Sequence, residues 1–393
     1  MWKTLREVDL AAVARTAEEP FHLAVLGRPG TGRRTLVQAM RLDPHKGLAS
    51  LAPVAGAYDL PLSAEDAQAL HGAQAVVLLL DATQADTTPE HEAFQQLSAQ
   101  HAVLVVAYNK ADLVADARDI LGKTDQWRPA PVMAIAATDR ARLENELVPA
   151  LLRLLAGREI AVARALPLFR PVVVRRLIDD AAFANAAYSF TTGLAEVVPL
   201  LDVPLNVGDM VMLTKNQGLL AFKIALAMGL STDWRRTVPQ LAAVVGAGFM
   251  WRQIGRSLVG LIPAWGIVPK VAVAYAGTVA VGQAVQYWAE TGERLKPAVL
   301  QERYRQAIAQ GKEFADTLIR RAGERRRQLA DQRLAAATAK NKTKKGHCPH
   351  CGRKAPRAAA WCPYCGRPLG PQAPALPSGD KGGAEAPPEP ELP

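Results

Sequence analysis

The stretch that decides the fold of the N-terminal part is FHLAVLGRPGTGRRTL, at residues 21–36. It begins with an apolar run at 21–27 that predicts a buried strand. A turn with glycines at 30 and 32 follows, and then a helix is predicted over 33–41. A strand, a glycine-rich turn and a helix in this order are typical of proteins in which helices cover a parallel sheet.

The rest of the N-terminal part repeats this alternation. Apolar runs at 75–80, 102–108 and 131–136 predict strands, and helical patterns lie between them at 64–72, 88–99 and 140–156. The alternation predicts an α/β domain over 1–157, a parallel sheet with helices on both faces. A short helix is expected before it, within 1–19, and this start is too acidic and too polar for a signal peptide.

The turn after the first strand has the residue types of a phosphate-binding loop. Backbone N–H groups of such a turn and the positive end of the helix dipole meet at one point, where phosphate binds well. The pattern GxxxxGK[ST] fits with Arg33 at the lysine position and Arg34 at the Ser/Thr position. An ordinary glycine-rich turn is the alternative. The candidate phosphate-binding residues are Gly27, Arg28, Pro29, Gly30, Thr31, Gly32, Arg33, Arg34 and Thr35.

A second motif, NKAD, directly follows the apolar run at 102–108. The carboxylate of Asp112 could accept hydrogen bonds from N1–H and the exocyclic amine of guanine, which adenine does not offer in that arrangement. Lys110 would pack over the base, and Asn109 would tie this loop to the phosphate loop. Alone, the tetrapeptide could be a helix cap with Asp112 as N-cap. Its place about 80 residues after the glycine-rich turn favours a nucleotide site.

A less specific motif, IAAT, follows the next predicted strand. There the backbone N–H groups of Ala136, Ala137 and Thr138 could donate to guanine O6. With these motifs together, the first 155 residues resemble an Era-like small GTPase domain. The resemblance implies a P-loop G domain that binds GTP or GDP, with Mg²⁺ as a further cofactor.

The sequence departs from that family where hydrolysis needs support. Arg34 replaces the Mg²⁺-binding hydroxyl, no threonine lies between Thr35 and Thr83, and the expected DxxG appears only as DLPL from Asp59. Phosphoryl transfer needs Mg²⁺ and a positioned water. The leading hypothesis is therefore a GTP-binding switch or scaffold, at most a slow GTP hydrolase, with no catalytic residue assigned. The alternative is an active GTPase that uses Thr35 and Asp59 for Mg²⁺.

The stretch 158–335 predicts an all-α hydrophobic domain that ends in a basic helix. Its residues 160–320, with the motif LTKNQ at 213–217, resemble the domain of unknown function 697. The resemblance implies a bacterial, membrane-associated protein. TKNQ echoes a guanine motif, but Gln217 replaces the aspartate, so we expect a helix there and no base-binding site.

The sequence leaves two alternatives for this hydrophobic domain, insertion into a bilayer and a buried helical core. Residues 271–289 approach the roughly 20 apolar residues of a spanning helix, but a buried core helix fits the same pattern. If two crossings occur, they lie within 238–268 and 271–289, with both termini in the cytoplasm. The expected location is the cytoplasmic face of the membrane, peripheral or two-pass, or otherwise the cytoplasm, with membrane or anionic lipid as a partner.

All four cysteines lie in CPHCGRKAPRAAAWCPYCG, at 348–366. Each CPxCG turn aims two thiolates at one point, and four thiolates form the tetrahedral set that Zn²⁺ prefers. We predict a structural zinc ribbon held by Cys348, Cys351, Cys362 and Cys365, with His347 and His350 as bystanders. The ribbon and a basic linker fill 336–369, and the proline-rich tail at 370–393 is expected to be disordered.

The net charge of +10 comes mostly from one segment, since Arg303 to Lys345 hold 13 basic and 4 acidic residues. A solvated helix face, attraction to anionic lipid and nucleic-acid binding are the three interpretations, although the segment lacks aromatic residues for base stacking. A third hypothesis is a non-enzymatic interaction protein whose G domain has lost nucleotide binding altogether and whose ribbon binds a protein or a nucleic acid. The sequence does not identify a protein partner.

Overall fold

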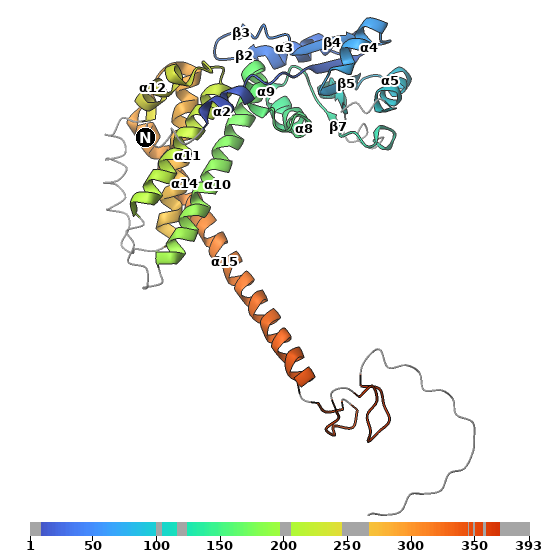
Figure 1. Cartoon of the computed structure of the whole chain (residues 1–393). Coiled ribbons are helices and arrows are strands. Elements are labelled where there is room, and N and C mark those ends of the chain that lie inside the picture. Colours follow the sequence, from blue (N-terminus) through green and yellow to red (C-terminus); the bar gives the residue numbers. More distant parts are fainter. Residues whose placement is uncertain are drawn as a thin grey trace, which may run out of the picture. The chain divides into compact units, whose positions relative to one another are not determined.

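The computed structural model describes residues 9–99, 104–115, 124–196, 206–245, 267–344, 346–348, 350–356 and 359–369. The chain divides into two compact units, residues 1–318 and 319–393 (Figure 1). The tail at 370–393 and most of the possible first crossing at 238–268 lie outside the described residues.

A five-stranded sheet forms the frame of the first unit. Its order is β4-β1-β5-β6-β7, and every neighbouring pair is parallel. The predicted α/β class is confirmed. The strands are β1 (Leu23–Gly27), β4 (Ala55–Asp59), β5 (Ala75–Asp81), β6 (Leu104–Asn109) and β7 (Val132–Ala134).

Helices cover both faces of this sheet because alternate side chains of the buried strands point to opposite sides. Leu23 and Val25 share a core with α3 (Arg33–Arg41) and α8 (Val148–Leu154). Ala24 and Leu26 share a second core with α4 (Ala64–His71), α5 (Thr88–Ala99) and the fully buried Trp127. Strands β1, β5 and β6 are buried along their whole length, which explains their uninterrupted apolar sequences.

Strand β4 is one element that the sequence analysis missed. Its sequence AGAYD is short of large apolar residues, and after the buried Ala55 its residues are half-buried or exposed because the strand forms the edge of the sheet. A small antiparallel hairpin of β2 (Leu42–Asp43) and β3 (Leu48–Ala49) precedes it and was also not predicted.

Shorter elements complete the sheet region. The helix predicted over 140–156 consists of α7 (Arg140–Arg142), a π-helical turn η3 (Leu143–Leu147) and α8. The remaining elements are α2 (Leu10–Thr16), η1 (Ala111–Leu113) and η2 (Asp125–Trp127).

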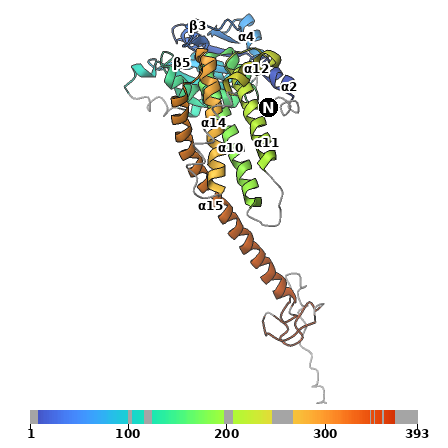
Figure 2. The ribbon, with the colours of Figure 1, turned by 90° about the vertical axis from the view of Figure 1, so that its left-hand side faces the viewer.

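The chain after the sheet is helical, as predicted. Helices α10, α11 and α14 lie side by side in both views and pack against one another (Figures 1 and 2). The stretch 336–344, expected as a linker, is a continuation of α15. The helices are α9 (Glu159–Ala165), η4 (Pro167–Phe169), α10 (Arg170–Glu196), α11 (Asn206–Ala227), α12 (Trp234–Val245), α14 (Ile267–Thr291) and α15 (Pro297–Lys344).

The sheet and the helices share one continuous core. Leu166, Leu168 and Phe169 are fully buried and join the core on the α3 face to that of the helices. A buried ion pair adds to this connection, since Arg170 Nη1 lies 2.6 Å from Asp43 Oδ2 in β2. A pocket of about 420 Å³ lies beside this pair and includes none of the predicted nucleotide-binding residues in its lining.

A polar cluster connects the three long helices. Asn185 in α10 donates to Thr278 Oγ1 in α14 at 2.9 Å and accepts from Asn216 in α11 at 2.6 Å. The TKNQ stretch therefore lies inside a helix, as expected, and its asparagine holds helices together. Within the described residues, Val268–Thr291 has the length and mean hydropathy of a membrane crossing, yet 67% of its apolar window is buried in the molecule. A core helix has the same properties.

Candidate nucleotide site and metal centre

Four residues of interest meet at the carboxyl edge of the sheet. Gly27 ends β1 opposite Asp59 of β4, and Asp81 ends β5 opposite Asn109 of β6. Numbered along the chain, the five strands have the order 2-1-3-4-5, in which the direction of winding changes between β1 and β5. Ligands of open α/β sheets bind in the crevice at this switch point, beyond the carboxyl ends of the strands.

The glycine-rich turn between β1 and α3 has the backbone geometry of an anion-binding loop. Gly30 and Gly32 have φ angles of +87° and +93°, and Gly32 begins α3 without a side-chain cap. The N–H groups of the first helical turn are therefore available to a ligand. A Cβ on Gly27 would lie 2.3 Å from the carbonyl oxygen of Leu79, so the turn requires glycine where it leaves the sheet.

Asn109 joins the glycine-rich turn to the loop after β7. Its Nδ2 donates to the carbonyl of Thr31 at 2.7 Å, and its Oδ1 accepts from the backbone N–H of Ala137 at 2.8 Å. The side chain is buried, and Gly32 leaves room for it, since a Cβ there would lie 2.3 Å from Nδ2. The structure thus brings the glycine-rich turn, NKAD and IAAT together.

Lys110 is held at the same edge by an acidic residue that the sequence analysis did not single out. Its ammonium group donates to Asp81, which also accepts from the N–H and hydroxyl of Thr83. Burial acts to raise the pKa of Asp81, but the hydrogen bonds from Lys110 and Thr83 outweigh it and lower the pKa. Asp81 could have been found from its position, because it ends an apolar run as Asn109 does.

The remaining base-site candidates differ in their exposure to solvent. Asp112 in η1 is exposed and makes no hydrogen bond or ion pair among the described residues. Ala136 and Ala137 are buried at the end of β7, and Thr138 is exposed beside them. A carboxylate without a partner, close in sequence to a buried anchor such as Asn109, is available to bind a ligand.

Arg33 is turned towards the edge strand β4. Its guanidinium donates to the carbonyl of Tyr58 and to the carboxylate of Asp59. The hydrogen bond from Arg33 lowers the pKa of Asp59. Arg34 and Thr35, on the next positions of α3, are exposed. Mg²⁺ prefers oxygen ligands, but Asp59 already binds a cationic side chain and Arg34 offers no oxygen, so these residues fit Mg²⁺ poorly.

Arg28 and Thr31 are held within the protein. Arg28 Nε lies 2.6 Å from Glu90 Oε1, and its Nη2 donates to the carbonyl of Asp86. Glu90 in α5 is fully buried, and its second oxygen has no hydrogen-bond partner among the described residues. Thr31 donates through its hydroxyl to the carbonyl of Arg28 at 2.9 Å. These bonds fix the shape of the loop, and Pro29 is exposed at its tip.

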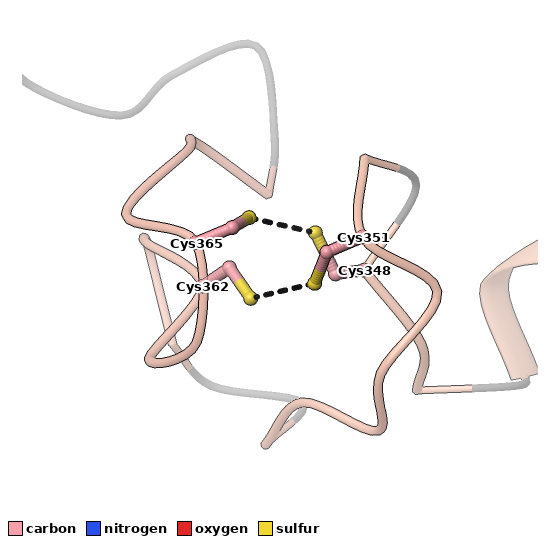
Figure 3. Close-up of side chains that lie close together, drawn as sticks. All are labelled: Cys348, Cys351, Cys362 and Cys365. Atoms are coloured by element: carbon pink, nitrogen blue, oxygen red, sulfur yellow. Dashed lines mark hydrogen bonds between the residues drawn. The ribbon is translucent and has the colours of Figure 1, made fainter.

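The four cysteines converge at one point in the second unit (Figure 3). Their sulfur atoms all lie within 4.8 Å of one another, with 3.6 Å between Cys348 and Cys365 and between Cys351 and Cys362. A tetrahedral ion with Zn–S bonds of about 2.3 Å requires sulfur atoms about 3.8 Å apart. The cluster is therefore positioned to bind a metal ion and is compatible with structural Zn²⁺.

The two halves of the cluster have the same backbone hydrogen bonds. Gly352 N–H donates to the carbonyl of Cys348, and Gly366 N–H donates to that of Cys362, both at 2.9 Å. Both glycines have positive φ, 72° and 65°, as the repeated CPxCG sequence predicts. Burial acts to raise the pKa of Cys348, but backbone N–H groups, among them that of His350, point at its sulfur and lower it. The histidine side chains are not part of the cluster.

Fold and site together define a protein with an α/β domain of Rossmann-like or P-loop type, a helical region and a four-cysteine cluster. No protein-family model matches the sequence, and no curated protein is similar to it.

Proposed function

We propose that this protein binds a guanine nucleotide at the carboxyl edge of its sheet and acts as a switch or scaffold. The observation that carries the proposal is the double hydrogen bond of Asn109, which holds the phosphate loop and the loop after β7 around one space. Asp112 would accept from N1–H and the exocyclic amine of guanine, and the N–H groups of 136–138 would meet O6. The aliphatic part of Lys110 would cover the base.

The same geometry supports the proposal that the sheet domain is Era-like. Three motifs separated by some 80 and 25 residues in sequence lie at one edge of one sheet, in the order that the resemblance requires. Phosphate would bind at the N–H groups of the glycine-rich turn and the first turn of α3. The exposed guanidinium of Arg34 could add charge there, because its planar donors match phosphate oxygens.

We propose slow or no hydrolysis. Magnesium would supply charge stabilisation and a positioned water in phosphoryl transfer. Arg34 stands where the family has a hydroxyl ligand, and the carboxylate of Asp59 is already bound by the guanidinium of Arg33. Turnover of GTP with and without Mg²⁺ tests this directly. Robust Mg²⁺-dependent turnover by the wild-type chain would favour the active GTPase instead, with Thr35 and Asp59 as ligands.

Membrane association is a separate proposal, which rests on the resemblance of 160–320 to the domain of unknown function 697 and on the apolar composition of α14. The polar cluster of Asn185, Asn216 and Thr278 is compatible with a bundle in either environment, since its members satisfy one another. Fractionation of cells with a carbonate wash tests the proposal. Recovery of the chain only in the soluble fraction would reject it.

A further inference from the structure

The charge of the chain is concentrated in the second unit. Residues 319–369 hold fourteen Lys and Arg but only two Asp and Glu, whereas residues 1–318 are nearly neutral, with 32 basic and 31 acidic residues. Within the ribbon itself, residues 346–369 contain no acidic residue. This concentration is not needed by the sheet domain or by the cysteine cluster, and it points to a polyanionic partner.

The arginines of α15 in this unit are available for such a partner. Arg325, Arg326, Arg327 and Arg333 are exposed and form no hydrogen bond or ion pair within the described part of the chain. Some exposed arginines of the first unit are instead paired with an acid on the same helix, as Arg176 is with Asp180. Unmatched guanidinium groups exchange their counterions for phosphates at little cost.

The distribution of these arginines favours a nucleic acid over a membrane surface. A helix that lies in a bilayer interface has one apolar and one basic face. Three consecutive residues span about 200° of a helix, so Arg325, Arg326 and Arg327 cover more than half of its circumference. The exposed large apolar side chains in this part, Ile319 and Leu329, are isolated and form no stripe.

The ribbon adds a feature that lipid recognition does not require. Tyr364 is 59% exposed, and the guanidinium carbon of Arg353 lies 5.4 Å from the centre of its ring. Exposed aromatic rings and arginine planes are the groups on which unpaired bases stack. Tyr364 lies between Cys362 and Cys365, and Arg353 follows Cys351 by two residues, so a bound metal that joins the two halves would hold this pair together.

We propose that residues 319–369 bind single-stranded nucleic acid, with the arginines of α15 on phosphates and the Arg353–Tyr364 pair stacked on a base. The proposal does not depend on nucleotide binding by the first unit. It accounts for both the charge of this part and the exposed ring of Tyr364.

The test uses the full chain loaded with zinc and a labelled single-stranded RNA or DNA of about 20 nucleotides, long enough for several contacts. Fluorescence anisotropy between about 50 and 200 mM salt gives the affinity and its salt dependence. The triple variant Arg325→Gln, Arg326→Gln, Arg327→Gln should weaken binding and reduce the salt slope by about 2, since each single-strand phosphate contact contributes about 0.7. In the matched control, the exposed Arg153, Arg175 and Arg176 of the first unit are replaced by Gln. This variant should change neither the affinity nor the salt slope.

The stacking part has its own variants. Tyr364→Ala should weaken binding about 5- to 150-fold with an unchanged salt slope, whereas Tyr364→Phe should bind like the wild type. Zinc content and circular dichroism show that each variant is folded.

The proposal is overturned if the wild type does not bind at low salt, or if the control triple variant loses as much affinity as the α15 variant. Binding to anionic vesicles of phosphatidylserine and phosphatidylcholine without binding to the oligonucleotide would also overturn it, in favour of a membrane. If Tyr364→Ala binds like the wild type, the stacking assignment is wrong.

Discussion

Asn109 donates from its side-chain amide to the backbone carbonyl of Thr31 at 2.7 Å, across 78 residues of sequence. The same amide group accepts from Ala137 N–H on its other side. A single buried side chain therefore determines how the loop that could hold phosphate faces the loop that could hold a base. The proposed function depends on this arrangement.

Asn109→Asp should weaken nucleotide binding and lower the free energy of unfolding by about 1–3 kcal/mol or more. The aspartate is the same size and can still accept from Ala137, but its carboxylate faces the carbonyl of Thr31 and cannot donate to it. Denaturant unfolding and nucleotide titration on the same variant measure the two effects. Wild-type stability and affinity in this variant would mean that the bridge is unimportant.

Gly32→Ala and Gly30→Ala form a matched pair in the glycine-rich turn. Both glycines have positive φ, so each alanine costs about 1–2 kcal/mol from its backbone conformation. At Gly32 the new Cβ also meets Asn109 Nδ2 at 2.3 Å, whereas at Gly30 nothing lies within 4 Å. We therefore expect Gly32→Ala to be clearly more destabilising in thermal unfolding and to impair nucleotide binding more. Equal effects would contradict the close approach of Asn109.

The ion pair of Asp43 and Arg170 should make stability depend on pH in the acidic range. Burial acts to raise the pKa of Asp43, but Arg170 and the N–H groups of His45 and Lys46 outweigh it and lower the pKa. A lowered folded pKa gives a contribution that is present above about pH 4, the usual value of Asp, and is lost as the pH falls through the folded value.

Removing one partner of this pair measures its strength. Arg170→Gln should cost about 3 kcal/mol at pH 7, because it leaves a buried carboxylate unpaired. In this variant the loss of stability on acidification below about pH 4 should be smaller than in the wild type. Arg176→Gln, on an exposed pair 3.9 Å apart, is the control and should change stability by less than about 0.5 kcal/mol. Equal costs in both variants would show that the buried pair does not hold the hairpin to α10.

One Zn²⁺ should bind per chain through the four cysteines. Any one of Cys348, Cys351, Cys362 or Cys365 changed to Ser should lower zinc content, whereas His350→Ala should not, since its side chain is not part of the cluster. A chelator should unfold the ribbon alone and leave the helical signal of the first unit, because the metal supplies the folding free energy of such small units. Elemental analysis without zinc in protein purified under reducing conditions would contradict the assignment.

Most of the fold could be predicted because its central strands are buried on both faces. Runs such as AVVLLL at 75–80 are apolar throughout, so their type and position follow from the sequence. Strand β4 could not be found in this way, since only Ala55 in it is buried and it includes no large aliphatic side chain. The length of α15 was underestimated because its last turns, KNKTK, are polar and lack helix-favouring apolar periodicity.

For the site, residue types were informative, but the internal contacts were not visible in the sequence. The pattern placed Arg33 on phosphate, yet in the structure it contacts Asp59 and Tyr58 of a strand that was itself missed. Asp81 pairs with Lys110, 29 residues away, and Glu90 pairs with Arg28, 62 residues away. No local sequence pattern predicts such distant ion pairs. The four cysteines were identified in full because their ligand set is contained in one repeated turn.

The central claim is tested most directly by isothermal titration of GDP, GTP and ATP into the wild-type chain and into Asp112→Ala, in EDTA and in Mg²⁺. We expect GDP and GTP to bind in both buffers and ATP to bind at least about tenfold more weakly. Asp112→Ala should remove this preference, because hydrogen bonds to a charged group contribute about 1.5–3 kcal/mol. The exposed Asp125→Ala is the matched control and should keep it. Equal affinity for ATP and GTP in the wild type, or no binding of any of the three, would contradict the account.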